Sequence, residues 1–188
     1  KINSNSNYTK ENFSDLEFHD DRVEQSEFED CKFISCNFSE TQFVECKFID
    51  CEFKSSNLNL VKLDKSKFLE TDFKDCKITG VNWTSLDWGS LNIISPIFFE
   101  SCDISFSVFN SLKLHELSLQ NCKVHDVDFS ECDLEGADFF RSDLMDSKFS
   151  FSFNADLCVK AFWYKSILDI FVPTRVSMVS LSMIILYD

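Results

Sequence analysis

Cysteine and histidine are the residue types in this sequence that could bind a metal or supply a nucleophile. The chain of 188 residues contains 9 Cys and 3 His. Structural zinc sites usually hold two cysteines two to four residues apart, whereas the close pairs Cys31/Cys36 and Cys46/Cys51 are each five residues apart. We therefore predict buried, free thiols that pack a core, and no metal site.

Catalytic motifs are missing from the sequence. It has no G-x-S-x-G elbow, P-loop or dinucleotide fingerprint, and 3 Gly are too few for the usual phosphate-cradling loops. His19, His115 and His125 are isolated and are predicted to lie on the surface. We predict a protein that is not an enzyme and that has no cofactor and no small-molecule substrate.

Carboxylates give the sequence its strongest chemical character. The formal net charge is −14, with nine acidic side chains and one basic side chain in residues 11–30, and nine acidic against two basic in residues 116–146. Residues 31–115 are nearly balanced, with eleven acidic and nine basic side chains. Proteins that bind nucleic acid directly carry a surplus of Lys and Arg, so we expect no direct nucleic-acid binding and a partner that is cationic or normally binds polyanions.

A five-residue repeat must position these side chains. Every fifth residue from Phe13 to Phe98 is large and apolar, the frame slips by one residue near residues 96–103, and the period resumes from Ile104 to Phe149. Small residues, among them eight of the nine cysteines, stand two positions before these centres, and polar residues stand beside them. A period of five fits neither an α-helix nor a flat strand, so the chain must turn a corner every five residues.

Segments such as EDCKF, VECKF and SECDL resemble the pentapeptide-repeat family. The resemblance implies an all-β fold, a right-handed quadrilateral parallel β-helix in which four repeats form one coil and residues i and i+20 stack. About seven coils are expected. We divide the chain into a polar N-terminal segment (1–10), the repeat domain (11–152) and a C-terminal cap or dimerisation segment (153–188).

Stacking of residue i on residue i+20 predicts two aromatic ladders in the core. The first consists of Phe13, Phe33, Phe53 and Phe73, and the second of Phe28, Phe48, Phe68 and Trp88. Phe129 and Phe149 belong to the core of the last coils.

The C-terminal segment has a different composition. After Pro173 the sequence predicts an apolar helix of about twelve residues, too short to cross a bilayer and too hydrophobic to remain in water. We expect it to close the last coil, to form a homodimer interface, or both. With no leader at the start of the chain, we expect no membrane association and a cytoplasmic protein. The predicted cap and dimer residues are Phe171, Val176, Met178, Val179, Leu181, Met183, Ile184 and Leu186.

Within the family the chain resembles the topoisomerase-protecting branch, which includes Qnr-type quinolone-resistance proteins and the microcin B17 immunity protein. The resemblance implies dimeric rods that mimic DNA on gyrase and topoisomerase IV. Gram-negative Qnr proteins carry two loop insertions, whereas this sequence shows only the one-residue slip, as expected of a loop-free member.

Asp128, Asp133, Asp138 and Asp143 occupy the same repeat position on four successive walls, so we expect a ring of carboxylates and a partner-binding acidic ridge. An alternative is that the acidity serves solubility and that the chain is a protein-interaction scaffold without topoisomerase activity. The predicted contact residues are Asp126, Asp128, Glu131, Asp133, Glu135, Asp138, Asp143 and Asp146.

Overall fold

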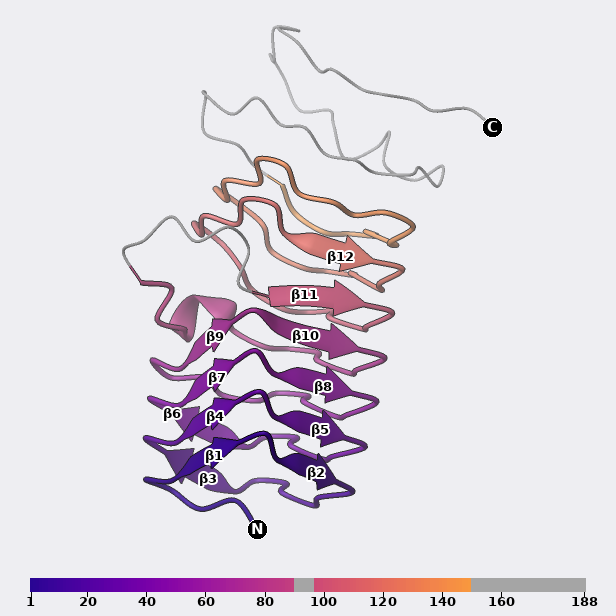
Figure 1. The fold of residues 1–188 in the computed structure, drawn as a ribbon. Helices are drawn as coiled ribbons and strands as arrows, with labels where there is room; N and C mark the ends of the chain where they lie inside the picture. The colour runs from indigo at the N-terminus through magenta and orange to yellow at the C-terminus, as the bar shows by residue number, and fades with distance from the viewer. Residues whose placement is uncertain (90–96, 150–188) are drawn as a thin grey trace, which may run out of the picture.

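A computed structural model describes residues 1–89 and 97–149 of the chain. These residues form a parallel β-solenoid, in which short strands stack above one another in successive coils (Figure 1). The predicted all-β pentapeptide-repeat fold is thereby confirmed. No α-helix occurs in these two ranges, and no helix there is long and apolar enough to cross a membrane.

Three faces of the solenoid contain strands. One sheet has the order β1-β4-β7-β9 and consists of β1 (Asn7–Thr9), β4 (Glu27–Glu29), β7 (Lys47–Ile49) and β9 (Lys67–Leu69). A second has the order β12-β11-β10-β8-β5-β2 and consists of β2 (Asn12–Ser14), β5 (Lys32–Ile34), β8 (Glu52–Lys54), β10 (Thr71–Lys74), β11 (Ile97–Glu100) and β12 (Ser118–Gln120). The third pairs β3 (Arg22–Glu24) with β6 (Gln42–Val44). Isolated parallel bridges such as Glu17↔Asn37 form the fourth face, and η1 (Trp83–Ser85) is a single 3-10 turn.

The corners between faces are made by residues with left-handed backbone conformation. Asp15, Asp20, Gln25 and Asp30 have φ between 50° and 56°, and the same conformation recurs every fifth residue. This conformation costs an L-residue about 1 to 2 kcal/mol. Most of these corners are held in place by the next coil, because the backbone N–H of the corner residue donates to a carbonyl there; the bond from Asp30 N to Ile49 O measures 2.9 Å.

The first predicted ladder is confirmed. The ring centroids of Phe13 and Phe33, Phe33 and Phe53, and Phe53 and Phe73 are 5.1, 4.5 and 5.0 Å apart, with interplanar angles of 10° to 13°. Neighbouring ladders meet edge to face, as Phe28 and Phe33 do at 5.5 Å and 70°. Both geometries suit the quadrupole of the aromatic ring.

The second ladder is confirmed only up to Phe68. Phe28 to Phe48 and Phe48 to Phe68 each measure 4.9 Å between centroids. Trp88 is half-buried, and its Nε1 donates to the carbonyl of Trp83 at 2.9 Å. Trp88 therefore packs against the core, as predicted, but it is only partly buried. Further along the rod, Phe129 is fully buried and stacks on the half-buried Phe149 at 5.2 Å.

The break in the repeat differs from the prediction. Strand β10 pairs with β11 so that Phe73 faces Phe99, and the bridge between Lys77 and Asp103 has the same spacing, i to i+26. A regular coil has the spacing i to i+20, so the chain contains six additional residues between Trp88 and Ile97. Six residues are one complete five-residue repeat plus one residue, so the spacing of the apolar centres in the sequence shows only a one-residue slip. Phe98, predicted as a centre, is 39% exposed, and Phe99 is 1% exposed.

Repeat packing starts earlier than residue 11. Strand β1 lies within residues 1–10, which were predicted to be a polar N-terminal segment outside the repeat domain, and the ring of Tyr8 stacks on Phe28 at 5.0 Å and 8°. Ile2 is also buried. The predicted C-terminal segment 153–188, with its helix and its eight cap or dimer residues, lies outside the described residues, and the number of coils stays a prediction.

Candidate protein-interaction surface

The predicted contact carboxylates surround the rod on all of its sides. Asp128, Asp133, Asp138 and Asp143 each precede a buried centre on a different face, and each forms a parallel bridge to the coil before it. Asp126, Glu131 and Asp146 occupy corners, with φ between 54° and 60°. We refer to Asp126, Asp128, Glu131, Asp133, Glu135, Asp138, Asp143 and Asp146 as the acidic band.

One oxygen of each face carboxylate is used to fix a local turn. The Oδ1 atoms of Asp128, Asp133, Asp138 and Asp143 accept the backbone N–H of the residue two positions later, at 2.9 to 3.4 Å. Aspartate commonly stabilises turns in this way. Hydrogen bonds from the side chain and backbone of Ser130 lower the pKa of Asp128. These aspartates are therefore held in fixed directions.

The second oxygen of two of these aspartates meets a histidine. His115 Nε2 lies 2.6 Å from Asp133 Oδ2, and His125 Nε2 lies 2.6 Å from Asp143 Oδ2. The expectation of isolated histidines is wrong for both residues. The sequence contains a signal for these pairs, because a residue just after one centre lies beside the residue just before the centre of the next coil, at the spacing i to i+18.

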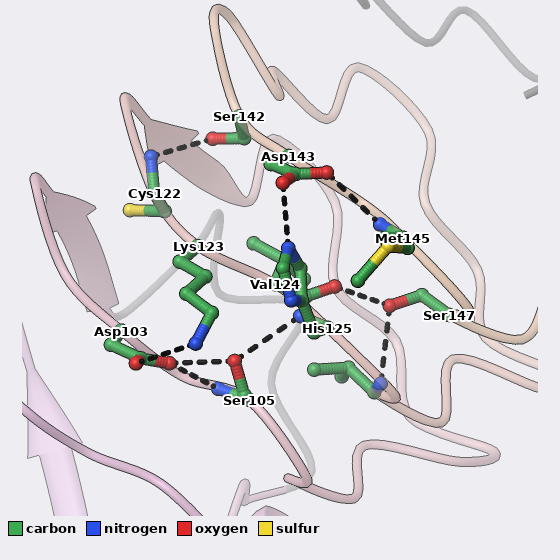
Figure 2. Close-up of polar contacts among 11 residues, drawn as sticks. Asp103, Ser105, Cys122, Lys123, Val124, His125, Ser142, Asp143, Met145 and Ser147 are labelled. Carbon is green, nitrogen blue, oxygen red and sulfur yellow. Dashed lines mark hydrogen bonds and ion pairs between the residues drawn. The ribbon is translucent and has the colours of Figure 1, made fainter. Parts of the chain in front are cut away.

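Figure 2 shows the second pair and the polar residues around it. The imidazole of His125 points toward Asp143, whose other oxygen faces the backbone nitrogen of Met145. The side chain of Lys123 points the other way, toward Asp103, with 3.4 Å between Nζ and Oδ2 (Figure 2). Only part of the negative charge is thus compensated within the rod.

Basic side chains stand in register with several members of the acidic band. Lys113 is the bridge partner of Asp133, Lys123 of Asp143, and Lys148 of Asp128. The hydrogen bond from His115 is the main reason why the pKa of Asp133 is lowered, and Lys113 adds to the effect. The surface is thus a mixed band with an acidic excess.

Three carboxylates of the band remain available to a partner. Among residues 1–89 and 97–149, the side chains of Asp126, Glu135 and Asp146 are exposed and form no hydrogen bond or ion pair. Asp126 and Asp146 lie at one corner in successive coils, since the N–H of Asp126 donates to the carbonyl of Met145, whereas Glu135 lies near another corner. An opposite charge placed against them would not have to displace an internal partner.

Among the described residues, one cluster has side chains of the types that bind metal ions close together: His115, Asp133 and Glu135. One possible ligand atom from each lies within 4.8 Å of the others. All three are at least partly exposed, and the equivalent pair of His125 and Asp143 has Met145 in the third position. Imidazole with two carboxylates could hold a divalent transition metal.

The cysteines contribute to packing. The eight cysteines within the described ranges are free and buried, as predicted. Cys51 Sγ donates to Phe28 O at 3.3 Å, and burial raises its pKa to about 12. Burial likewise raises the pKa of Cys132 to about 11. A thiol with such a pKa is a poor nucleophile at neutral pH.

Comparison with protein families agrees with this architecture. A model described as "Pentapeptide repeat region" matches residues 26–95, and a model described as "Pentapeptide repeats (8 copies)" matches residues 113–150. Together they cover more than half of the chain. The chain belongs to the pentapeptide-repeat family. No curated protein matches this pentapeptide-repeat chain.

Solved structures with a similar fold include QnrB1, described as a plasmid-mediated fluoroquinolone resistance protein. A trypsin-treated variant is 20% identical, covers 86% of this pentapeptide-repeat chain and 93% of its own, and gives a TM-score of 0.39. Full-length QnrB1 is 16% identical; the match covers 76% of this chain and 93% of QnrB1, with a TM-score of 0.31. A third structure is HetL of the cyanobacterium Nostoc sp. strain PCC 7120, a pentapeptide-repeat protein involved in heterocyst differentiation regulation. It is 13% identical, and the match covers 77% of this chain and 88% of HetL, with a TM-score of 0.24.

Proposed function

We propose that this pentapeptide-repeat protein is a non-catalytic, acidic binding protein that mimics DNA and binds DNA gyrase or topoisomerase IV. Membership of the pentapeptide-repeat family supports a protein-interaction scaffold. The charge density of the acidic band supports DNA mimicry and binding to a type II topoisomerase.

Charge per unit length supports the proposal. Residues 109–148, which correspond to two coils, carry nine acidic and four basic side chains, for a net charge of −5. Two coils rise by about 9.6 Å at the ~4.8 Å spacing of paired strands. Duplex DNA carries about six negative charges over the same length. By contrast, residues 31–70 carry six acidic and six basic side chains, so the match is confined to the acidic part of the rod.

The test is titration of the purified protein into a gyrase supercoiling assay, with and without a quinolone. We expect an effect at micromolar concentration, and no effect under either condition would overturn the proposal. The triple variant Asp126→Lys, Glu135→Lys and Asp146→Lys should abolish the effect, because it replaces negative charge with positive charge on the proposed contact surface. The fold should be retained, because these side chains have no internal partner to lose.

A matched control reverses three exposed acids at the other end of the rod. Asp15→Lys, Asp21→Lys and Glu29→Lys change the net charge by the same amount and should leave the effect in place. If this control abolished the effect and the first triple variant did not, the contact surface would lie at the N-terminal end.

We further propose that the protein is a homodimer joined through its C-terminal segment. The apolar composition of residues 174–188 motivates this proposal. Sedimentation velocity of the full chain should show a dimer, and Met183→Asp with Ile184→Asp should convert it to a monomer. A monomeric full chain would refute the proposal.

A second candidate is a scaffold without topoisomerase activity, in which acidity serves solubility. The observation that favours it is the internal compensation of the acidic band by His115, His125 and nearby lysines. Under this alternative, the triple reversal would lower solubility and leave supercoiling unchanged.

A further inference from the structure

Two large apolar side chains are exposed on one corner of the solenoid. Leu60 is 53% exposed and Phe106 is 62% exposed. Both have left-handed backbone conformation, with φ of 55° and 62°. Among the 24 non-glycine residues with positive φ in the described ranges, these two are the apolar ones. The other corner residues are charged or polar, as expected for positions that face water.

Leu60 and Phe106 belong to one vertical column, with Gly80 between them. The N–H of Leu60 donates to Thr79 O, the residue just before Gly80, and the N–H of Gly80 donates to Ser105 O, the residue just before Phe106, each at 2.9 Å. A Cβ on Gly80 would lie 2.6 Å from Leu60 Cδ2. Leu60 therefore extends along the rod over the bare backbone of Gly80. We refer to Leu60, Gly80 and Phe106 as the apolar corner.

Acidic residues continue the same column at both ends. Asp20 and Glu40 precede Leu60, and their N–H groups donate to Ser39 O and Asn59 O at 3.0 and 2.8 Å. Beyond Phe106, whose N–H donates to His125 O, the column continues with Asp126 and Asp146. Asp20, Glu40, Asp126 and Asp146 are all exposed. The column thus reads acidic, apolar, acidic along the rod.

The backbone conformation of Leu60 and Phe106 makes the apolar corner unfavourable for the free energy of folding. Each left-handed leucine or phenylalanine costs about 1 to 2 kcal/mol compared with an ordinary conformation, and most of its apolar surface remains in water. Other corners avoid part of this cost with Asn or Gly. Strained, exposed apolar residues that line one face of a protein are typical of binding surfaces.

We propose that the apolar corner docks a basic protein segment. Its apolar side chains would cover Leu60 and Phe106, and its Lys or Arg side chains would meet Glu40 and Asp126. Four coil steps separate these two acids, a distance of about 19 Å at ~4.8 Å per step. An extended peptide covers this distance with about six residues.

Charge also argues against a second copy of the chain as the occupant. Pairing of two apolar corners would bring their acidic flanks together, in a protein with a net charge of −14. The inference does not depend on topoisomerase binding, because the apolar contacts of Leu60 and Phe106 are separate from the acidic band and only Asp126 belongs to both surfaces.

The experiment uses the full chain, immobilised and panned with a library of random twelve-residue peptides. We expect enriched peptides to have one or two aromatic or aliphatic residues flanked by Lys or Arg. Leu60→Asn with Phe106→Asn should weaken their Kd at least tenfold, since asparagine accepts positive φ but removes the apolar surface. Raising the salt concentration should also weaken binding.

Phe98→Ser is the matched control, because Phe98 is an exposed aromatic residue on another part of the rod. Its Kd should equal that of the unmodified protein. The thermal midpoint of the double variant should be unchanged or higher, and a lower midpoint would indicate that the corner serves packing.

Four other results would overturn the proposal. They are no enrichment of peptides, enrichment of peptides without cationic residues, equal binding to the double variant, and self-association of the chain that the double variant abolishes.

Discussion

Phe73 and Phe99 stack with ring centroids 5.2 Å apart and an interplanar angle of 16°, although more than one regular coil of sequence separates them. Their pairing continues the ladder of Phe13, Phe33, Phe53 and Phe73 without a change in ring geometry. The six additional residues therefore leave the stack uninterrupted, and the coils on both sides of them remain in register.

Deletion of residues 91–96 should leave the fold intact. Ser90 would then connect to Ile97, and Phe73 and Phe99 would acquire the regular spacing, i to i+20. We expect a thermal midpoint within a few degrees of the unmodified protein, measured by circular dichroism. Deletion of Asp64 alone, inside a regular coil, should lower the midpoint sharply because it shifts every later centre. Equal effects of the two deletions would contradict this interpretation of the register.

Truncation of one ring in the ladder should be costly. Phe48 is fully buried between Phe28 and Phe68, so Phe48→Ala should lower the free energy of unfolding by about 3 to 5 kcal/mol. Phe98→Ala should cost less than about 1 kcal/mol because the side chain already contacts water. Urea unfolding of both variants measures the difference. Similar losses would mean that stacking does not dominate stability.

The contact between His115 and Asp133 can be measured by titration. Because the hydrogen bond from His115 is the main cause of the lowered pKa of Asp133, His115→Ala should raise that pKa toward the ordinary value. Carbon NMR of the carboxyl group provides the measurement. Asp128 is the internal control, because Ser130 causes its lowered pKa. If Asp128 moved as much as Asp133, the cause would be a general change of the rod.

The same group predicts how stability depends on pH. A lowered folded-state pKa means that Asp133 stabilises the fold above its unfolded pKa of about 3.9, and that this contribution is lost as the pH falls through the lower folded value. Since the side chain is 43% exposed, screening keeps the contribution below about 1 kcal/mol. The difference in unfolding free energy between the unmodified protein and Asp133→Asn should therefore shrink as the pH falls below the unfolded pKa, and should vanish below the folded pKa. A difference that persisted there would point to a neutral packing effect.

The buried cysteines should resist alkylation. Burial raises the pKa of Cys51 to about 12, and its thiol is enclosed by neighbouring coils. Iodoacetamide at pH 8 should label Cys51 and Cys132 only at the rate of unfolding, and within seconds in strong denaturant. Peptide mapping by mass spectrometry distinguishes them from Cys158. Rapid labelling of either residue in the folded protein would contradict the packing described above.

The fold could be predicted from the sequence, because the five-residue period of apolar residues fixes how often the chain turns a corner. Each Phe centre repeats the same inward direction, so the ladder from Phe13 to Phe73 follows from counting. Counting could not locate the break, because the run Pro96 to Phe99 offers two adjacent phenylalanines and a period of five cannot distinguish one extra residue from six. The pairing of β10 with β11 and the bridge between Lys77 and Asp103 show that the number is six.

The functional surface was less predictable. The positions of the acidic band follow from the repeat, but the contacts of Asp133 and Asp143 with histidines depend on side-chain directions across two coils. The apolar corner was missed because Leu60 and Phe106 lie far apart in the sequence and come into one column only when the six additional residues are counted. Trp88 is only partly buried although the indole of Trp83 at the preceding centre is fully buried, so the type of the side chain did not predict its burial.

The vertical register also constrains how this sequence can evolve. A substitution at one position alters the contacts with the residues directly above and below it in the neighbouring coils. Compensating substitutions among homologues should therefore pair position i with position i+20. Across the segment between Trp88 and Ile97 the partner of position i should become i+26. Pairwise covariation in an alignment would thus display the register of residues 1–149, including the change of step between Trp88 and Ile97, as two parallel diagonals.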